Sequence, residues 1–517
     1  MTKKISKIVA IPFKLLFSRF TLALLSVLIQ AAIIGAIFFF FDKYLLYYVG
    51  SVVLFQIGLT IYIINSSIQS EFKTAWIILV LSLPVVGGFF FLFCKIEPTV
   101  KAMQERLKRS KNENYKYLPQ NREIIEKLTE EDQSFISHAN YLYKVGHFPV
   151  YYGEDMKYFA CGEKAYPDLL SKLKEAKKFI FLEFFIIAND EMWQEILDIL
   201  ISKAQSGVEV RVLYDGTCSF TLLPRNYPEL LKEKGIKCLI FSPIVPLIST
   251  HYNNRDHRKI IVIDGKYGYT GGMNLASEYI NKKERFGYWK DNLFRFSGTA
   301  VNSLTVLFLE SWYLSQRKKE IAYEPYLTAT NNHKKDGYLV VLGDDPCDNE
   351  PISKMTYIHL LYTAKKSIDI VTPYFIVDGE FLNALFYATK RGVRIRLILP
   401  GIPDKKLINY VAKTYYKELV THNVKLYEYS KGFTHLKEMI CDDSSCFLGT
   451  SNLDYRSLYL HYEDGLYLYK SEEVQRIKED YDQMIASSKL ITFEEIKKIS
   501  KVKIFLGKIL RIFGPLL

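Results

Sequence analysis

The first hundred residues contain three long stretches of uncharged, mostly apolar residues. They run from Phe20 to Phe41, from Tyr44 to about Asn65 and from Thr74 to Cys94. Each reaches the ~20 residues that an α-helix needs to cross ~30 Å of hydrocarbon. A buried helix of a soluble protein would explain any one stretch, but three in succession favour membrane spans. The pattern predicts an all-α membrane domain over residues 20–94, with about three transmembrane helices, in a multi-pass protein of the cell membrane.

Basic residues flank the predicted spans on both sides. The N-terminal segment, residues 1–19, carries five Lys and Arg residues, which favours a cytoplasmic N-terminus. Three spans would then place the rest of the chain outside the cell. Five more basic residues between Lys101 and Lys111 favour the opposite orientation, which an interfacial N-terminal segment or a re-entrant span would allow. The face of the membrane that carries the rest of the chain stays open.

Beyond about Asn112 the pattern changes to short apolar strands that alternate with helices, as in an α/β domain. Buried strands are expected at residues 179–187 and 368–376. A predicted helix follows each, and then a strand of similar sequence, Gly207–Asp215 and Gly392–Pro400, at an offset of 185 residues (392 − 207). The repetition predicts two homologous α/β halves.

A second repeat contains polar residues that can carry chemistry. HRKIIVIDGKYGYTGGMN at 257–274 matches HLKEMICDDSSCFLGTSN at 435–452, and its His, Lys, Asp and Asn positions share one offset of 178 residues (435 − 257). A constant offset over four positions is hard to attribute to chance. Because ligands of such sheets commonly bind outside the carboxyl ends of the strands, a duplicated fold can bring both motifs to one shared site.

The repeats also set the expected domain boundaries. We expect a first half at residues 112–330, with its motif in 252–279, and a second half at 331–498, with its motif in 430–457. The last segment, residues 499–517, mixes Lys and Arg with hydrophobic residues. It is either a helix that lies in the interface of an anionic membrane or a terminal helix that packs on the domain.

Charge and cysteine content narrow the possible partners. The net charge of +12 suits an anionic partner, which includes nucleic acid, anionic lipid and phosphate-bearing substrates. The seven cysteines are scattered and form no CxxC pair, so neither a disulfide framework nor a zinc site is expected.

The residue types of the repeated motif suit phosphoryl transfer. His257 and Lys259, two apart on a strand, project to the same face, as do His435 and Lys437. A histidine beside a carboxylate has its tautomer fixed, which leaves the other ring nitrogen free to attack or to donate a proton. A lysine beside it supplies positive charge for phosphoryl oxygens. A single such pair would more often be structural, but two identical copies favour a site. We expect no metal and no other cofactor, because each lysine repels a cation.

These motifs resemble the phospholipase D superfamily, and within it the bacterial cardiolipin synthases. The two HxKxxxxD motifs carry the resemblance, together with Tyr288–Asp291 (YWKD), Trp312 and the run NLDYRS at Asn452–Ser457, with Glu463 beyond it. It covers nearly the whole chain beyond the first span. It implies two phospholipase D-like halves that share one active site. It also implies phosphatidyl transfer from one phosphatidylglycerol to another, with glycerol released and no cofactor used.

The resemblance also implies residue roles. His257 would attack the donor phosphorus, and His435 would protonate the departing glycerol and then activate the acceptor hydroxyl. The remaining expected site residues hold phosphoryl oxygens, orient the histidines or support the site. The phosphoryl oxygens would be held by Lys259 and Lys437 with Asn274 and Asn452. The histidines would be oriented by Asp264 and Asp442. The site would be supported by Glu278 and Glu463.

Other functions stay open. A membrane phospholipase D would pass the phosphatidyl group to water, and a membrane-anchored nuclease would use the same chemistry on DNA. The spans and the NLDYRS run disfavour the nuclease, so no nucleic acid partner is expected, and a non-catalytic scaffold would not need the intact motifs. The sequence specifies neither the acceptor lipid, the acyl-chain preference nor the oligomeric state.

Overall fold

The fold is taken from a computed structural model. It describes residues 44–516 except 96–97, 115, 244–253, 317–320, 329–333 and 349, together with four isolated positions before residue 44. The chain divides into an N-terminal unit, which ends near Ala102, and a second unit that holds nearly all of the other described residues. The predicted first span and the basic segment 1–19 lie outside the described residues.

The N-terminal unit contains the other two predicted spans. The second span is one helix, α3 (Leu45–Ile64), and within the described residues it is the only one long and apolar enough to cross a membrane. The third span is not a single helix. It is divided into α4 (Ser70–Ser82) and α5 (Pro84–Lys95), each shorter than the ~30 Å of a bilayer core at ~1.5 Å per residue. The break falls at Leu83, because a residue before proline avoids the helical conformation.

The helices of this unit pack closely. α3 contacts both α4 and α5, and a Cβ at Gly88 of α5 would lie 2.4 Å from the Phe55 ring of α3. Hydrophobic side chains of α3 nevertheless remain outside the packing, with Leu46 79% and Leu54 71% exposed. A helix with apolar residues on its exposed side suits a lipid environment. The helix α6 (Pro98–Asn114) follows.

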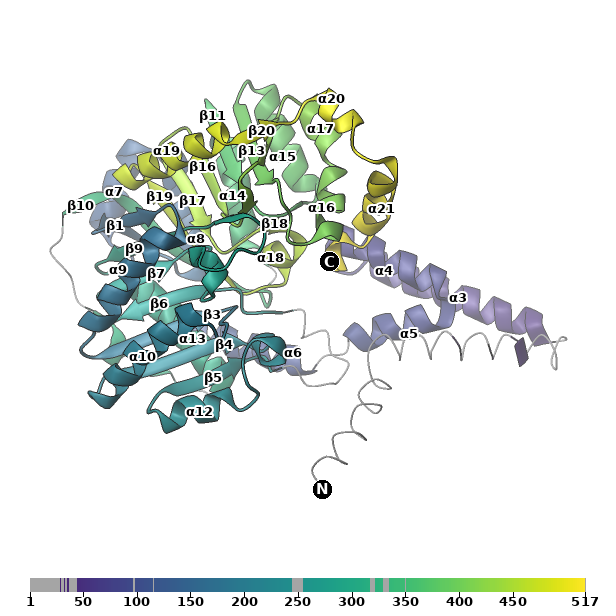
Figure 1. The fold of residues 1–517 in the computed structure, drawn as a ribbon. Coiled ribbons are helices and arrows are strands. Elements are labelled where there is room, and N and C mark those ends of the chain that lie inside the picture. The colour runs from purple at the N-terminus through teal and green to yellow at the C-terminus, as the bar shows by residue number, and fades with distance from the viewer. Residues whose placement is uncertain are drawn as a thin grey trace. The chain divides into compact units, whose positions relative to one another are not determined.

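Two mixed β-sheets form the frame of the second unit (Figure 1). The seven-stranded sheet has the order β2 (Lys157–Phe159), β9 (Leu293–Ser297), β7 (Tyr267–Thr270), β6 (Lys259–Ile263), β3 (Phe179–Phe184), β4 (Glu209–Asp215) and β5 (Lys237–Phe241). The nine-stranded sheet has the order β1 (Val150–Glu154), β10 (Lys335–Asp344), β19 (Glu463–Tyr469), β17 (Ser445–Gly449), β16 (Glu438–Cys441), β11 (Ser367–Val371), β13 (Arg394–Pro400), β14 (Lys425–Tyr429) and β20 (Ser488–Leu490).

Six strands of each sheet repeat one plan. β3, β4 and β5 are parallel, whereas β6, β7 and β9 are added antiparallel. β11, β13 and β14 are likewise parallel, and β16, β17 and β19 are added in the same order. The predicted α/β repeat is therefore confirmed in strand order. One strand crosses the predicted boundary at residues 330 and 331, because β1 pairs with β10 in the second sheet.

Helices cover both sheets (Figure 1). Before and within the first half they are α7 (Arg122–Glu131), α8 (Gln133–Gly146), α9 (Gly162–Glu175), α10 (Glu191–Gln205), α11 (Cys218–Thr221), α12 (Tyr227–Glu233) and the 3-10 helix η3 (Ser277–Ile280). After β9 they are α13 (Val301–Gln316), η4 (Glu324–Tyr326), α14 (Ile352–Thr363), α15 (Gly379–Lys390), α16 (Lys406–Lys413), α17 (Tyr416–Thr421), α18 (Tyr455–Tyr459), α19 (Glu472–Ala486), α20 (Phe493–Lys497), α21 (Lys501–Ile512) and η5 (Gly514–Leu516).

The helix α13 joins the two sheets. It contacts β6 of the first sheet and β10 of the second, and every residue from Val301 to Trp312 is buried. Phe308 of α13 stacks on Phe181 of β3 with ring centroids 4.5 Å apart. A helix that is buried all round needs no polar face, and this one shares its core with both halves.

Two short parallel pairs add further strands. β15 (Gly432–Thr434) pairs with β8 (Tyr288–Lys290), and β12 (Phe375–Ile376) pairs with β18 (Leu453–Asp454). The β15–β8 pair links the segment before His435 to the first half. The motif of one half is thus held directly by backbone of the other.

Candidate active site

Both motif histidines line one cavity of about 500 Å³. His257 precedes β6 and His435 follows β15, so each lies where its half meets the other. Aromatic side chains form much of the wall, and several charged and polar side chains also reach the cavity. The aromatic residues are Phe185, Tyr279, Phe286, Trp289, Tyr374, Phe433 and Tyr455, and the charged and polar ones include Asn274, Glu278, Arg285, Asp404, Lys405, Asn452, Asp454, Arg456 and His461.

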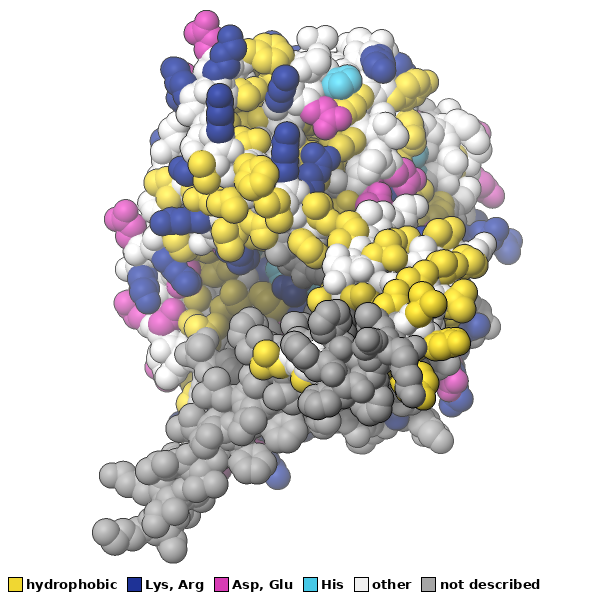
Figure 2. Space-filling model, turned by 90° about the vertical axis from the view of Figure 1, so that its right-hand side faces the viewer, with side chains coloured by type: hydrophobic (Ala, Val, Ile, Leu, Met, Phe, Trp, Pro, Cys, Tyr) yellow, Lys and Arg dark blue, Asp and Glu magenta, His cyan; other side chains and the backbone are white. Residues whose placement is uncertain are grey.

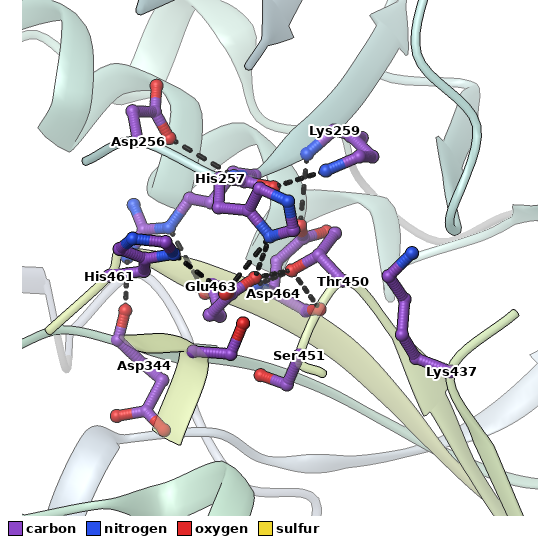
Figure 3. Close-up of polar contacts among 12 residues, drawn as sticks. Asp256, His257, Lys259, Asp344, Lys437, Thr450, Ser451, His461, Glu463 and Asp464 are labelled. Carbon is purple, nitrogen blue, oxygen red and sulfur yellow. Dashed lines mark hydrogen bonds and ion pairs between the residues drawn. The ribbon is translucent and has the colours of Figure 1, made fainter. Parts of the chain in front are cut away.

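The His257 imidazole is held by a carboxylate of the second half. Its Nδ1 lies 2.8 Å and 3.0 Å from the two carboxylate oxygens of Glu463, the first residue of β19. The backbone N–H of His257 donates to the Tyr462 carbonyl, and Thr450 donates its hydroxyl to Glu463. Figure 3 shows the ring directed at Glu463, with Lys259 and Lys437 to one side. With Nδ1 engaged, Nε2 is the nitrogen left for chemistry.

The His435 imidazole has the mirror arrangement. Its Nδ1 lies 2.7 Å from Asp291 Oδ2, and its backbone N–H donates to the Lys290 carbonyl. Asp291 directly follows β8 and is fully buried. Each histidine therefore depends on a carboxylate from the opposite half.

Strand register shows that the two carboxylates occupy equivalent positions. Thr270 pairs with Phe294 in the first sheet, and Leu448 pairs with Leu466 in the second. Thr270 and Leu448 differ by 178 residues (448 − 270), but Phe294 and Leu466 differ by only 172 (466 − 294). Asp291 and Glu463 also differ by 172 (463 − 291). Six residues are thus absent from the second half between motif and carboxylate.

The two motif lysines are fully buried beside the histidines. Lys259 donates from Nζ to the His257 carbonyl at 2.7 Å, and Lys437 donates to the His435 carbonyl. Burial lowers the pKa of Lys437 to about 7, although the charge of Asp291 opposes the shift. Burial also lowers the pKa of Lys259. Buried ammonium groups gain most from an anionic ligand, because little water screens the attraction.

Burial sets the charge state of the other groups as well. It raises the pKa of Asp291 to about 6 against the charge of Lys437. It lowers the pKa of His435 well below the usual range, and Lys437 and Lys259 lower it further. Burial alone would raise the pKa of Glu463, but the adjoining His257 imidazole holds that pKa well below its usual range.

The motif aspartates do not orient the histidines, and this prediction was wrong. Asp264 accepts backbone N–H groups of Lys177, Lys178 and Phe179. Asp442 does the same for Lys365, Lys366 and Ser367. Each aspartate follows its strand at the end away from the histidine, because β6 and β16 run straight from one to the other. Their contacts fasten the start of β3 and of β11, which is a structural role.

The other predicted residues reach the cavity with different partners. Asn274 accepts the Ile186 N–H and donates to the Tyr279 hydroxyl. Asn452 lines the cavity with its Oδ1 free of any protein hydrogen bond, so it can receive a donor from a ligand. Glu278 forms an ion pair with Arg285 at 3.0 Å.

The sequence patterns gave no role to Asp291, which holds His435, or to several charged residues that line the cavity. Asp291 lies in the YWKD segment, and Arg456 lies in the NLDYRS run, so both had a local signal. Lys405 and Arg285 lie in segments without a motif and reach the cavity only through the fold. Arg285, Lys405 and Arg456 add cationic groups around the two histidines.

One group among the described residues has ligand types that could hold a metal ion. The ligand atoms of His257, His461 and Glu463 lie within 4.8 Å of one another. The Nδ1 of His461 is 3.6 Å from Glu463 Oε1, and its ring centroid is 5.5 Å from that of His257. However, Glu463 already holds His257. The buried Lys259, two residues after His257, would also repel a metal cation. The expectation of no metal stays a prediction.

Comparison with known proteins gives close relatives. The family described as "Cardiolipin synthase, PLD-like domain" matches residues 169–290 and 357–485. A cardiolipin synthase of Alkalihalophilus pseudofirmus is 35% identical over 450 residues, which are 86% of this chain and 88% of that protein. A cardiolipin synthase of Halalkalibacterium halodurans is 33% identical, over 89% of this chain and 92% of the relative. An uncharacterised protein of Streptococcus mutans is 40% identical over 89% of this chain and its own full length.

A solved structure shares the fold. The phosphatidylserine synthase of Haemophilus influenzae superposes with a TM-score of 0.57 at 15% identity, over 74% of this chain and 98% of that one. The two segments that match the cardiolipin synthase family contain His257 and His435, one in each. The chain therefore belongs to the cardiolipin synthases, phosphatidyltransferases with the phospholipase D-like fold.

Proposed function

We propose that this chain makes cardiolipin by transferring a phosphatidyl group from one phosphatidylglycerol to another, with glycerol as the second product. One observation carries the proposal: two histidines, each held by a carboxylate of the opposite half, line the same cavity. The cavity then serves as one active site shared by two homologous halves, about 112–330 and 331–498. Its cationic groups suit a phosphodiester.

In the first step His257 Nε2 attacks the phosphorus of the donor lipid. A P–N bond forms, the P–O bond to the head-group glycerol breaks, and His435, which takes up a proton when the anionic phosphodiester binds, gives this Nε2 proton to the departing oxygen. The Glu463 carboxylate stabilises the positive ring of the phosphohistidine. Lys259 and Lys437 stabilise the phosphoryl oxygens, helped by the amides of Asn274 and Asn452.

In the second step the acceptor replaces glycerol. His435 takes the proton from the primary hydroxyl of a second phosphatidylglycerol, whose oxygen attacks phosphorus and breaks the P–N bond. The number of phosphoester bonds is unchanged, so the transfer is reversible. Aromatic walls such as Trp289 and Phe433, which contact His435, limit the water that would otherwise hydrolyse the intermediate.

The membrane unit supports a lipid substrate. A diacyl lipid leaves the bilayer only at a cost of ~0.8 kcal/mol per buried CH₂, so an enzyme that is anchored in the membrane meets its substrate there. α3 supplies one candidate span. We propose that the chain is a multi-pass protein of the cell membrane whose partners are phosphatidylglycerol and other anionic lipids.

Purified full-length protein incubated with phosphatidylglycerol alone tests the function. Cardiolipin and glycerol in equal amounts are expected. Phosphatidic acid as the main product would make the chain a hydrolase, and cleavage of DNA without any lipid product would make it a nuclease. The catalytically dead pair His257→Ala and His435→Ala serves as the control, and full activity in either variant would contradict the two-histidine mechanism.

The division of labour between the histidines has its own test. Phosphatidylglycerol labelled in its phosphate is mixed with enzyme, quenched within one turnover and digested to peptides. Label on the peptide that contains His257 is expected. Label on His435 would reverse the two roles.

A further inference from the structure

The C-terminal helix α21 is fixed to the domain along one side. A Cβ at Gly507 would lie 2.2 Å from the Tyr410 carbonyl oxygen of α16, so only glycine allows this approach. The Arg511 guanidinium lies 3.7 Å from the centroid of the Tyr415 ring. One of the two expectations for residues 499–517, packing on the domain, is therefore correct for this side.

The opposite side of α21 is hydrophobic and exposed. Val502, Phe505, Leu506, Ile509 and Ile512 are between 40% and 65% exposed, and we call these five residues the α21 face. At ~100° per residue they fall within an arc of about 120°. Lys501 and Lys508 border this arc on one side and Lys503 on the other. Residues 499–517 contain no acidic residue.

The hydrophobic surface extends beyond the helix. Ile402 is 43% and Leu407 is 57% exposed, and both belong to the segment that enters α16, the helix against which α21 packs. Figure 2 shows hydrophobic side chains together with Lys and Arg side chains on the side of the molecule where α16 and α21 lie.

The same segments form part of the cavity wall. Asp404, Lys405 and Ile408 line the cavity that contains both histidines, and so does Gly514 just beyond α21. The exposed hydrophobic surface and part of the cavity wall are therefore formed by the same two chain segments. A lipid that enters the cavity with its head group would bring its acyl chains towards this surface.

We propose that the α21 face, with Ile402 and Leu407, docks on an anionic lipid surface and holds the cavity at the membrane interface. This inference rests on the proposed function, because it supplies the route by which phosphatidylglycerol reaches the histidines. A lipid surface fits better than a protein partner, because an apolar arc bordered by lysines inserts its hydrophobic side chains while the ammonium groups stay at the head groups. Anionic head groups also match the positive charge of residues 499–517, which contain Lys and Arg but no acidic residue.

Fluorescence quenching by brominated lipid tests the docking without any need for activity. Full-length Phe505→Trp and Tyr362→Trp are reconstituted in vesicles of phosphatidylcholine and phosphatidylglycerol with brominated acyl chains. Tyr362, at the end of α14, is 48% exposed and precedes β11, whose carboxyl end leads to the site, so it is an aromatic control away from the cavity. The wild-type signal is subtracted to remove the four native tryptophans.

The added fluorescence of Phe505→Trp should fall about twofold or more, while that of Tyr362→Trp changes little. Equal quenching of the two variants would overturn the proposal. The same result is expected if a second copy of the chain or another protein, instead of lipid, covers the α21 face. Undiminished quenching of Phe505→Trp in vesicles without anionic lipid would overturn the electrostatic part.

Kinetics then separates this proposal from the proposed function. Ile509→Asp should lower cardiolipin synthesis from vesicles roughly tenfold and leave turnover of a water-soluble short-chain phosphatidylglycerol unchanged. Leu490→Asp, which charges a comparably exposed leucine on β20, is the matched control. An equal loss on both substrates would contradict docking. An inactive wild-type protein would refute the proposed function, while the quenching result would still decide the docking.

Discussion

His257 and Glu463 belong to different halves of the chain, yet Nδ1 of the histidine lies within 3.0 Å of both carboxylate oxygens. His435 and Asp291 repeat the relationship in the opposite direction. The four residues make the two halves depend on each other, since each motif histidine is held by a carboxylate of the other half.

Replacing Glu463 by Gln should lower kcat roughly 10²- to 10⁴-fold, because an amide neither fixes the tautomer nor stabilises a positive ring. Product formation from phosphatidylglycerol measures the loss. The isosteric change should leave the fold intact. Glu473→Gln replaces another buried carboxylate, one that bonds the Tyr158 N–H away from the cavity, and should retain activity. Wild-type activity in Glu463→Gln would sink the assigned role.

Replacing Asp264 by Asn should affect stability more than catalysis. The side chain accepts three backbone N–H groups, and asparagine tolerates the positive φ of 56° at this position. Weakened charged hydrogen bonds should cost about 1–3 kcal/mol, seen as a lower midpoint of thermal unfolding. Activity per folded molecule should stay close to wild type, and Asp442→Asn should behave alike. A large loss of kcat with unchanged stability would restore a catalytic role. Asp198→Asn, at an exposed position of α10, is the control.

The rate should have a bell-shaped pH dependence with limbs near pH 6 and pH 7. Below about pH 6 Asp291, whose pKa burial raises to about 6, becomes protonated and no longer accepts from His435. Above about pH 7 Lys437, whose pKa burial lowers to about 7, loses its charge and binds phosphate less well. The profile of kcat/KM from pH 5 to 9 measures both limbs. Lys437→Arg should remove the alkaline limb, because guanidinium stays charged. A flat wild-type profile over this range would refute both assignments.

Removal of divalent metal should leave the activity unchanged. The two buried lysines already supply positive charge at the phosphoryl group, and Glu463 is engaged by His257. Treatment of the purified enzyme with EDTA, followed by gel filtration and assay, is the measurement. A loss of activity that added metal reverses would identify His257, His461 and Glu463 as a metal site after all.

Sequence alone predicted the features that depend on local pattern. The apolar stretch at α3, the repeated strands β3 and β11, and the two histidine–lysine pairs are all set by spacing within a few residues. The break at Leu83 had a visible cause in Pro84. The length of the apolar stretch predicts a single span, but the proline divides it into two shorter helices.

The partners of the histidines could not be found in this way. Asp291 lies within the YWKD segment, but nothing local shows that it reaches a residue 144 positions away. The offset of 178 also does not relate Asp291 to Glu463, because six residues are absent between the second motif and Glu463. The resemblance implies that the motif aspartates orient the histidines, whereas a straight strand carries Asp264 to the opposite end.

The exchange of carboxylates between the halves has a historical consequence. A single-copy ancestor with this arrangement would have been functional only as a symmetric dimer, in which each subunit completed the other's histidine. Within one chain the two halves need not be identical, and one carboxylate is glutamate while the other is aspartate. The two ends of the pocket can therefore differ in the groups that hold their histidines.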